Sequence, residues 1–279
     1  MRTFLLTTAA LAAIAPACAF AAEPGPVSEL VVTATRLPSR IDLVTGAHVI
    51  DQAEIEARQA PFASDLLSTL PGVGVARTGA FGGVTAIRIR GASPDKTLVL
   101  VDGVPVGDPA DPNGSFDASQ IQTGDLARVE VLSGPQGSLW GSDAIGGVVS
   151  FTTRQVSGLR AEAEGGRYGT ARGVLAAGLA EDRYGLSASV TGFRTDGISR
   201  AAAGAERDPF STVTANLRGR LKLGETVQLD AGLRYTTSDI AIDGFPPPTF
   251  NLGDTPDRAN SHAWQGFGRG AFDALGLRH

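Results

Sequence analysis

The sequence contains one cysteine and three histidines, which leaves few side chains for covalent or metal chemistry. Cys18 lies in an N-terminal segment that we expect to be cleaved, so the mature chain can form neither a disulfide nor a thiolate metal site. His48, His262 and His279 stand without a partner motif, and neither a G-x-S-x-G nor an H-E-x-x-H sequence occurs. These absences argue against an enzyme, and no cofactor is required for chemistry.

Blocks of like charge and long apolar runs are also absent. The chain has 24 basic and 29 acidic residues, and loss of Arg2 with the N-terminal segment leaves 23 − 29 = −6. Because a nucleic-acid-binding protein needs a basic surface, we expect no nucleic-acid partner. Beyond residue 21 no apolar run approaches the roughly 20 residues of a spanning helix. Barrel strands, which alternate and escape hydropathy windows, are not excluded.

The N-terminus has the features of a Sec signal peptide. Arg2 precedes an apolar run over residues 4–15, Pro16 ends that run, and Ala19-Phe20-Ala21 forms a cleavage site. We expect cleavage after Ala21, so that residues 1–21 are the signal peptide. About 12 apolar residues are too few for a membrane anchor. A lipoprotein interpretation through Cys18 lacks the leucine usually found before a lipidated cysteine.

Residues 22–43 predict a mobile periplasmic tether. Pro24, Pro26 and Pro38 flank an isolated extended run at residues 30–34. Such a segment can add as a strand to the sheet edge of a partner, and an ordinary edge strand is the alternative.

Residues 44–154 predict a compact α+β domain with a small mixed sheet and short helices, large enough for one core. Asp51 and Glu54 resemble a capping box, and a second helix over residues 64–70 ends at Pro71-Gly72. Strands are predicted at residues 86–90, 97–101, 129–132 and 147–153.

From residue 155 to residue 279 the pattern changes to alternation. Leu229 and Leu233 alternate with Asp230 and Arg234, which gives one apolar and one polar face, as in a transmembrane antiparallel β-barrel with a wet lumen. Turns such as Gly169-Thr170 are short, whereas residues 195–211 and 239–261 are expected to be long loops. A soluble sandwich with one polar face is the alternative. Six strand segments are expected, near residues 159–168, 170–180, 184–194, 212–223, 226–238 and 262–272.

Several motifs, in one consistent order, carry a resemblance to a known family. They are ELVVTATR at residues 29–36, LPGV at 70–73, IRIRG at 87–91, LVLVDGV at 98–104, RVEV at 128–131 and LWGSDAIGGVV at 139–149. Together they resemble TonB-dependent outer-membrane transporters, and the last motif is especially similar to the vitamin B12 branch. The resemblance implies a plug domain inside a barrel, an outer-membrane location in contact with lipid, and uptake of a scarce small molecule such as cobalamin.

The resemblance also implies a partner and a set of binding residues. The first motif is similar to the TonB box, which binds the energy-transducing protein TonB through Glu29, Leu30, Val31, Val32, Thr33, Ala34 and Thr35. By position, plug contacts with the ligand are implied at Val84, Ala86, Ser93, Asp111, Pro112 and Asn113. Gly141, Gly146 and Gly147 are expected to form a tight turn rather than a ligand contact.

Calcium is implied in the same branch, because acidic loop residues offer the hard oxygen ligands that calcium prefers. The matching positions are Glu206, Asp208 and Asp243, with Asp196 and Asp239 close by. Ser199 stands where an aspartate ligand is expected, and solvated loop acids are the alternative.

Arg88 and Arg90, alternating with apolar neighbours, are expected either to pair with barrel carboxylates or to face solvent.

Barrels of this family have about 22 strands, whereas six segments are counted in this chain. We therefore expect an incomplete barrel that cannot transport alone, because an open edge leaves backbone groups unpaired in lipid. A ferric siderophore or another nutrient is an alternative ligand. A non-transporting plug that acts as a periplasmic binding module is an alternative function.

Overall fold

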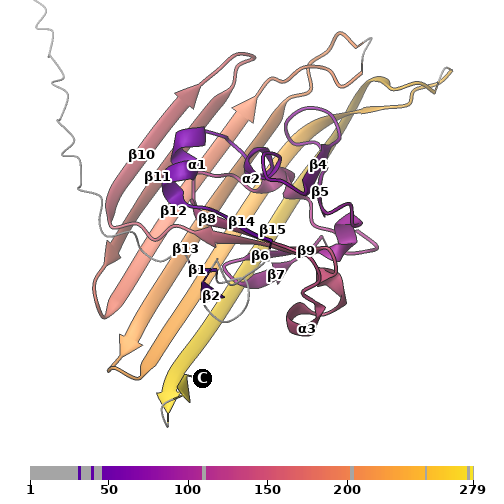
Figure 1. The fold of residues 1–279 in the computed structure, drawn as a ribbon. Helices are drawn as coiled ribbons and strands as arrows, with labels where there is room; N and C mark the ends of the chain where they lie inside the picture. The colour runs from indigo at the N-terminus through magenta and orange to yellow at the C-terminus, as the bar shows by residue number, and fades with distance from the viewer. Residues whose placement is uncertain are drawn as a thin grey trace, which may run out of the picture. The chain divides into compact units, whose positions relative to one another are not determined.

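The computed structural model describes residues 31–32, 39–40, 46–108, 111–201, 204–248, 250–274 and 277–278. The expected signal peptide and most of the tether lie outside these residues (Figure 1). Within the described ranges, no helix is long and apolar enough to cross a membrane.

A five-stranded mixed sheet forms the centre of the first domain (Figure 1). Its order is β3-β8-β9-β6-β7, with β6 and β9 parallel and the other neighbours antiparallel. A separate hairpin pairs β4 with β5. The strands predicted from the sequence are present, whereas β3, β4 and β7 were not predicted. The bounds are β3 (Ala47–Ile50), β4 (Val73–Arg77), β5 (Thr85–Ile89), β6 (Thr97–Val101), β7 (Val104–Val106), β8 (Leu126–Ser133) and β9 (Gly147–Thr153).

Short helices cover this sheet. Helix α1 (Gln52–Arg58) begins as predicted, because the carboxylate of Asp51 accepts a hydrogen bond from the Glu54 N–H at 2.9 Å. Helix α2 (Ala63–Leu67) is shorter than the predicted 64–70, because a tight turn precedes Pro71 and the Leu70 N–H donates to Leu67 O at 3.0 Å. The remaining helical turns are η2 (Pro94–Lys96), η3 (Ala118–Gln120), α3 (Gly137–Trp140) and η4 (Ser142–Ala144).

The core of this domain lies on both faces of the sheet. One face buries Val129, Val149 and Phe151 against Ile55 of α1 and Leu66 of α2. The other face packs side chains of β6, β8 and β9 against Ala144 and Trp140. Burial of a large apolar side chain contributes roughly 1.5–3 kcal/mol, so the domain has a core of its own.

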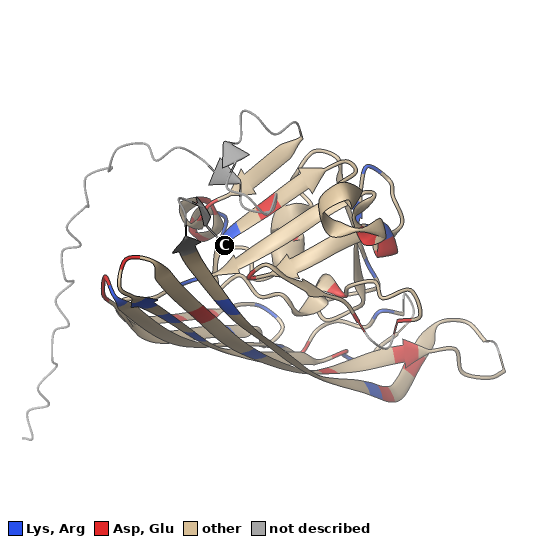
Figure 2. Cartoon of the chain, turned by 90° about the horizontal axis from the view of Figure 1, so that it is seen from below, with Lys and Arg blue, Asp and Glu red and all other residues tan. Residues whose placement is uncertain are grey.

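The second part of the chain is one curved antiparallel sheet in sequential order from β10 to β16. The first domain lies against its concave face (Figure 2). The six predicted segments correspond to six long strands, which confirms the alternating pattern as barrel strands. The bounds are β10 (Gly158–Gly165), β11 (Ala171–Ala180), β12 (Tyr184–Thr195), β13 (Phe210–Leu223), β14 (Val227–Gly244), β15 (Gly253–Ala274) and β16 (Leu277–Arg278).

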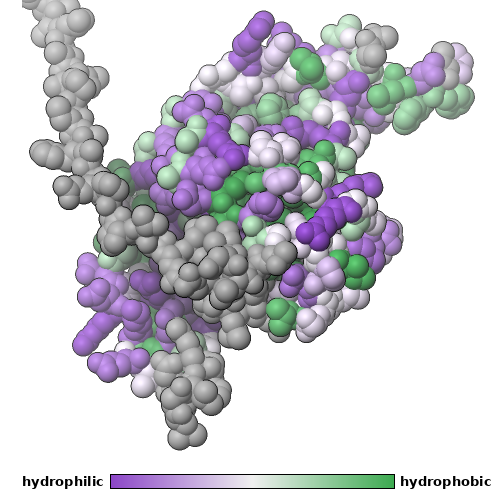
Figure 3. All heavy atoms as spheres, viewed as in Figure 1, coloured by the Kyte–Doolittle hydropathy of each residue, from purple (hydrophilic) through white to green (hydrophobic). Residues whose placement is uncertain are grey.

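Two expectations about the connections are wrong. Residues 239–261 are not a long loop, because β14 and β15 continue pairing to Gly244↔Gly253 and only residues 245–252 join them. The polar residues in this stretch suggested a loop, but paired strands that project beyond an apolar band can be polar on both faces. The hairpin tip carries exposed Phe245 and Phe250 and projects at the upper right of Figure 3.

The turn at Gly169-Thr170 lies at the same end of the sheet as the long loops. The Asp196 N–H donates to Tyr168 O at 2.8 Å, which joins this turn to the loop of residues 196–209. In an antiparallel sheet every second connection returns to the same end, so the short turns of the opposite end are residues 181–183 and 224–226. We call these the loop end and the turn end.

The two faces of the sheet have different chemistry. Leu175, Val190, Leu217, Leu233 and Trp264 point away from the first domain and are 47% or more exposed, as a lipid-facing band requires. Residues between them on each strand face inward and are more polar. The outward Tyr235 and Trp264 rings lie 4.4 Å apart.

One dry contact joins the two parts of the fold. Phe62 at the start of α2 packs edge-on against Phe193 of β12, with ring centroids 5.0 Å apart. Phe210 and Ile240 complete the buried cluster, and Phe81 packs against it. Aromatic pairs add about 0.5–1.5 kcal/mol beyond their buried area, so this aromatic cluster is a strong point of attachment.

We expect Phe62→Ala to lower the free energy of unfolding of the first domain by about 3–5 kcal/mol, because Phe62 is 2% exposed and its loss leaves a cavity. Phe250→Ala is the matched control, since this side chain is 68% exposed, and it should change stability by less than about 0.5 kcal/mol. Urea unfolding measures both. Equal losses would contradict a dry attachment at Phe62.

Candidate functional site

A buried ion pair holds the first domain to the inner face of the sheet. Asp125, which directly precedes β8, lies 2.6 Å from Arg234 Nη1 of β14, and these side chains are 1% and 6% exposed. Asn216, opposite Arg234 in the β13–β14 register, also donates to the Asp125 carboxylate. Because burial makes an unpaired charge costly, neither partner can leave without the other being solvated.

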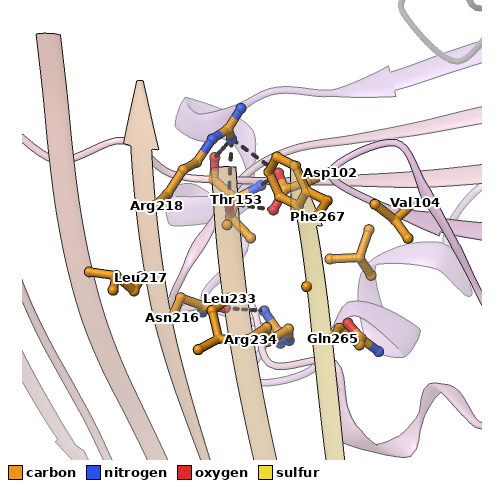
Figure 4. Close-up of a pocket in the computed structure, with 13 residues that line it drawn as sticks. Asp102, Val104, Thr153, Asn216, Leu217, Arg218, Leu233, Arg234, Gln265 and Phe267 are labelled. Atoms are coloured by element: carbon orange, nitrogen blue, oxygen red, sulfur yellow. Dashed lines mark hydrogen bonds and ion pairs between the residues drawn. The ribbon is translucent and has the colours of Figure 1, made fainter. Parts of the chain in front are cut away.

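A second pair lies at the β6–β7 turn (Figure 4). Asp102 has φ 50°, so its carboxylate turns back toward the end of β9. It accepts from the Thr153 N–H at 2.9 Å and from Thr153 Oγ1 at 2.8 Å, and Arg218 Nη1 of β13 donates to it at 3.1 Å. Arg269 of β15 donates to the Asp102 carbonyl oxygen. One aspartate therefore ties together the first domain's sheet and two barrel strands.

A cavity of about 20 Å³ lies between these two ion pairs. Its lining includes Arg218, Arg234 and Gln265, which are drawn as sticks in Figure 4. Arg234 Nη2, Arg218 Nε and Gln265 Oε1 are buried without a hydrogen-bond partner among the described residues. The volume is suited to about one water molecule. The contact is thus polar and suited to hydration, and too small for a solute.

A larger cavity of about 330 Å³ separates α1 from β10 and β11. Arg154, Arg160 and Arg172 line it together with Glu56 and Thr123. Arg154 lies 2.7 Å from Glu56, and Arg172 Nη2 donates to Thr123 Oγ1 at 3.1 Å. A cavity of this size and polarity holds many waters. Water can therefore replace these contacts as they break.

These ion pairs have a polarity opposite to the one considered from the sequence. Arg88 and Arg90 were expected either to pair with barrel carboxylates or to face solvent, and both side chains are exposed. The ion pairs described across the interface join carboxylates of the first domain, at Asp102, Asp125 and Glu56, to barrel arginines. The alternation of polar and apolar residues along the barrel strands predicted a polar inner face. It could not predict which plug residue each barrel arginine pairs with, because that depends on the three-dimensional fold.

Acidic side chains gather at the loop end. Oxygen atoms of Glu206, Asp243 and Asp254 lie within 4.8 Å of one another, and we call these three the carboxylate cluster. Asp208 lies beside it and is 3% exposed. Burial, and then the neighbouring carboxylates of Asp254, Asp243 and Asp208, raise the pKa of Glu206. Burial and repulsion from Asp243 raise the pKa of Asp208, against a hydrogen bond from the Arg200 N–H.

The donor set fits a hard divalent cation such as calcium. Ala201 N–H donates to Asp243 Oδ2 at 2.8 Å and Ala205 N–H donates to Asp254 Oδ2 at 2.8 Å, so the loop backbone orients both carboxylates. Asp243 Oδ1 and Asp208 Oδ1 are buried without a partner among the described residues. Clustered carboxylate oxygens with free lone pairs are typical calcium ligands.

The structure brings together only part of the predicted acidic set. Asp196 instead pairs with Arg207 at 3.1 Å, and Asp239 pairs with Arg258. Ser199 contacts the cluster, because its hydroxyl donates to Asp254 at 3.0 Å. Asp254 was missed. The only signal in the sequence is the mirrored order Asp243-Gly244 and Gly253-Asp254 on the two sides of the hairpin.

The predicted ligand-contact residues lie in three separate segments. Val84 is 64% exposed, and Ala86 follows it on β5. Ser93 lies beyond the other end of β5, as the N-cap of η2. Asp111 accepts from the Asn113 N–H at 2.7 Å, and this hydrogen bond and one from Ser115 lower its pKa, with Ser115 contributing most. Pro112 is exposed. Among the described residues no hydrogen bond joins these segments.

The predicted TonB box lies mostly outside the described residues. Glu29, Leu30, Thr33, Ala34 and Thr35 are not described, whereas Val31 and Val32 form β1, which pairs with β2 (Ser39–Arg40). The proposed role of this segment in binding a partner stays a prediction.

Comparison with known sequences identifies related proteins. A family model described as TonB-dependent Receptor Plug Domain matches residues 39–148. The vitamin B12 transporter BtuB of Photobacterium profundum is 34% identical over 216 residues, which cover 75% of this chain and 34% of that protein. BtuB of Vibrio vulnificus is 38% identical over 125 residues, or 44% of this chain and 20% of that protein. This chain thus spans at most about a third of the length of these relatives.

Solved structures share the fold. The receptor FpvA of P. aeruginosa, bound to a heterologous pyoverdine, has a TM-score of 0.70 at 16% identity and covers 88% of this chain and 34% of its own. A variant of the ferric enterobactin receptor PfeA of Pseudomonas aeruginosa has a TM-score of 0.63 at 19% identity, covering 88% and 40%. At these identities the likeness is one of fold alone.

We expect Arg234→Ala to cost about 3–5 kcal/mol of stability, because Asp125 would remain buried and uncompensated. Adding Asp125→Asn should recover part of this loss by removing the buried charge. Arg207→Ala is the matched control, since Arg207 is 66% exposed in its pair with Asp196, and exposed pairs contribute about 0–1 kcal/mol. Thermal unfolding in detergent measures all three. An Arg234→Ala loss no larger than that of the control would refute the buried pair.

Proposed function

We propose that this chain, whose residues 39–148 match the plug domain of TonB-dependent receptors, is the plug and the first barrel strands of an outer-membrane transporter for cobalamin or a related corrinoid. The observation that carries this assignment is the 34% identity to a vitamin B12 transporter over 216 residues, which extends beyond the plug. Because the chain spans about a third of that relative, uptake is proposed for the protein of the complete reading frame.

In this proposal the loop end faces the outside of the cell and binds the ligand. The predicted contacts on the plug are Val84, Ala86, Ser93, Asp111, Pro112 and Asn113. The TonB box at residues 29–35 would add as a strand to TonB on the periplasmic side. Force on the plug would then break the ion pairs that lie beside water-sized cavities, where water can replace each lost partner, before it breaks the dry aromatic contact. Binding and gated passage of this kind involve no bond chemistry.

The carboxylate cluster supports calcium as part of the binding site. Glu206, Asp208 and Asp243 were proposed from the sequence, and Asp254 is added by its position beside them. Burial raises the pKa values of Glu206 and Asp208, and repulsion between neighbouring carboxylates adds to the shift; a bound cation would neutralise that repulsion. Ser199, Ala201 and Glu206, which donate to these carboxylates, would then be held in one arrangement.

A ferric siderophore is the alternative ligand. The solved structures with this fold include receptors for a pyoverdine and for ferric enterobactin, but the higher sequence identity is to vitamin B12 transporters. A periplasmic binding module without transport is the other alternative, and the lipid-facing band of the barrel strands disfavours it.

Calorimetry with cyanocobalamin tests the ligand. The protein from the complete reading frame, purified from outer membranes, should give saturable heat near one ligand per chain in calcium and weaker binding after chelation. A ferric siderophore serves as the comparison ligand. No heat with cyanocobalamin under either condition would reject the corrinoid assignment, and saturable heat with the siderophore alone would establish the alternative.

Calcium titration at several pH values tests the cluster. A carboxyl whose pKa is raised on folding stabilises the fold in its protonated form, below the unfolded pKa of about 4, and this contribution is lost as pH rises through the raised pKa. Calcium competes with those protons, so its affinity should rise with pH over the same window.

The variant Asp243→Asn should weaken calcium binding at pH 7.5 by at least about tenfold, which corresponds to about 1.4 kcal/mol. Asp196→Asn is the control, because Asp196 is paired with Arg207 away from the cluster. Equal affinity in both variants, or an affinity independent of pH, would show that the cluster is not the cation site.

A further inference from the structure

A glycine-rich loop of the plug receives two side chains from the barrel. This plug loop, residues 78–84, is closed by a hydrogen bond from the Thr78 N–H to Val84 O at 3.0 Å. A Cβ added at Gly79 would lie 2.7 Å from Cγ and Cδ of Arg200, closer than real Cβ atoms come to a neighbour. A Cβ at Gly82 would overlap the ring of Phe210. The two glycines therefore allow these side chains to lie directly on the plug backbone.

The two contacts differ in what holds the barrel residue. Phe210 is 1% exposed and belongs to the aromatic cluster with Phe62 and Phe193, so its position is fixed by dry packing. Arg200 lies in the outer loop, residues 196–209, and its Nε and Nη2 are buried without a hydrogen-bond partner among the described residues. The first contact is a fixed anchor, whereas the position of the second depends on the outer loop.

The outer loop binds the carboxylates through the residues on both sides of Arg200. Ser199 Oγ donates to Asp254 at 3.0 Å, and the Ala201 N–H donates to Asp243 at 2.8 Å. The Arg200 N–H itself donates to Asp208 at 2.8 Å. A three-residue segment thus touches the acidic groups with its backbone and its flanking hydroxyl, while the side chain of its central residue reaches the plug.

We propose that Arg200 is a positioning residue that couples cation binding at the carboxylate cluster to the plug loop and to Val84 at its end. The proposal rests on the cation site of the proposed function. When a cation draws the carboxylates together, residues 199–201 move with them, and the stem of Arg200 presses on Gly79. Because Phe210 holds Gly82 in place, the backbone of the plug loop is displaced between Gly79 and Gly82, and Val84 at the end of the loop moves as well. Coupling of two sites is reciprocal, so changes at Gly79 also alter cation affinity.

A spin label at position 84 tests the coupling without transport. Val84 is 64% exposed and Cys18 lies in the expected signal peptide, so Val84→Cys gives one thiol within residues 22–279. Any cysteine in the rest of the reading frame is replaced by serine. Adding calcium should change the spectrum of this label in the protein with native Arg200. In Arg200→Ala the calcium-induced change should be at most about one third as large. Arg200→Lys, which keeps the aliphatic stem against Gly79, should restore the change. A label at Leu139→Cys on α3, 40% exposed, is the control and should not respond.

Cation affinity supplies the reciprocal measurement. Gly79→Ala should weaken calcium binding by about fivefold or more, in line with typical coupling between sites. Gly91→Ala is the matched control, because it carries the same backbone strain (φ +78° against +85°) but has no atom within 4 Å of the added Cβ. Calorimetric titration with calcium measures both.

The outcomes separate this inference from the proposed function. Calcium binding with no response at position 84, or with the same response in Arg200→Ala, overturns the coupling and leaves the cation site standing. Absence of calcium binding in every variant overturns both the coupling and the cation site. A response at position 84 that Arg200→Ala removes, in a protein that does not bind cyanocobalamin, supports the coupling and rejects the corrinoid ligand.

Discussion

The inner face of the barrel strands must hold a plug that is folded around its own core, and this constraint governs the rest of the structure. Strict alternation along each strand assigns one set of side chains to lipid and the other to the plug. If the inner set were apolar, the plug would be attached as firmly as a domain core. The structure instead uses buried charges, Asp125 with Arg234 and Asp102 with Arg218. A buried pair contributes little net stability but strongly penalises wrong partners and displaced positions, so it can fix where the plug sits without making it permanent.

The surface of the plug is divided accordingly. Near the loop end, Phe62 and Phe81 of the plug meet Phe193 and Phe210 of the barrel in a contact that excludes water. Elsewhere the contact is polar and contains cavities that suit water. The hydrophobic contact resists separation at every step, whereas the polar contacts exchange one partner for a water molecule at a time. The plug is therefore held unevenly, by one dry contact and by several polar ones.

Local patterns predicted the elements of this fold well and their contacts less well. The N-cap at Asp51, the predicted strands of the plug sheet and the six long strands follow from spacing and alternation, which act within a few residues of chain. Asp254 could not be assigned, because its place beside Asp243 depends on an irregular register between Ile242 and Gly244. The partners of Arg218 and Arg234 lie more than 100 residues away in the chain. The end of the sheet occupied by Gly169-Thr170 was predictable in principle, since it follows from counting strands.

The register irregularity near the tip of the β14–β15 hairpin has a consequence for how such a protein can diversify. Below the pair Ile242↔Asp257 the two strands are locked residue by residue, and a slip of one position would turn every lipid-facing side chain inward. Above it the pairing is already interrupted, so residues there can be added, lost or exchanged without shifting the strands beneath. The carboxylates of Asp243 and Asp254 and exposed aromatic residues such as Phe245 lie in this upper part. The same two strands thus have an upper stretch whose sequence can change without altering the register, and a lower stretch in which every substitution must respect the two faces of the sheet.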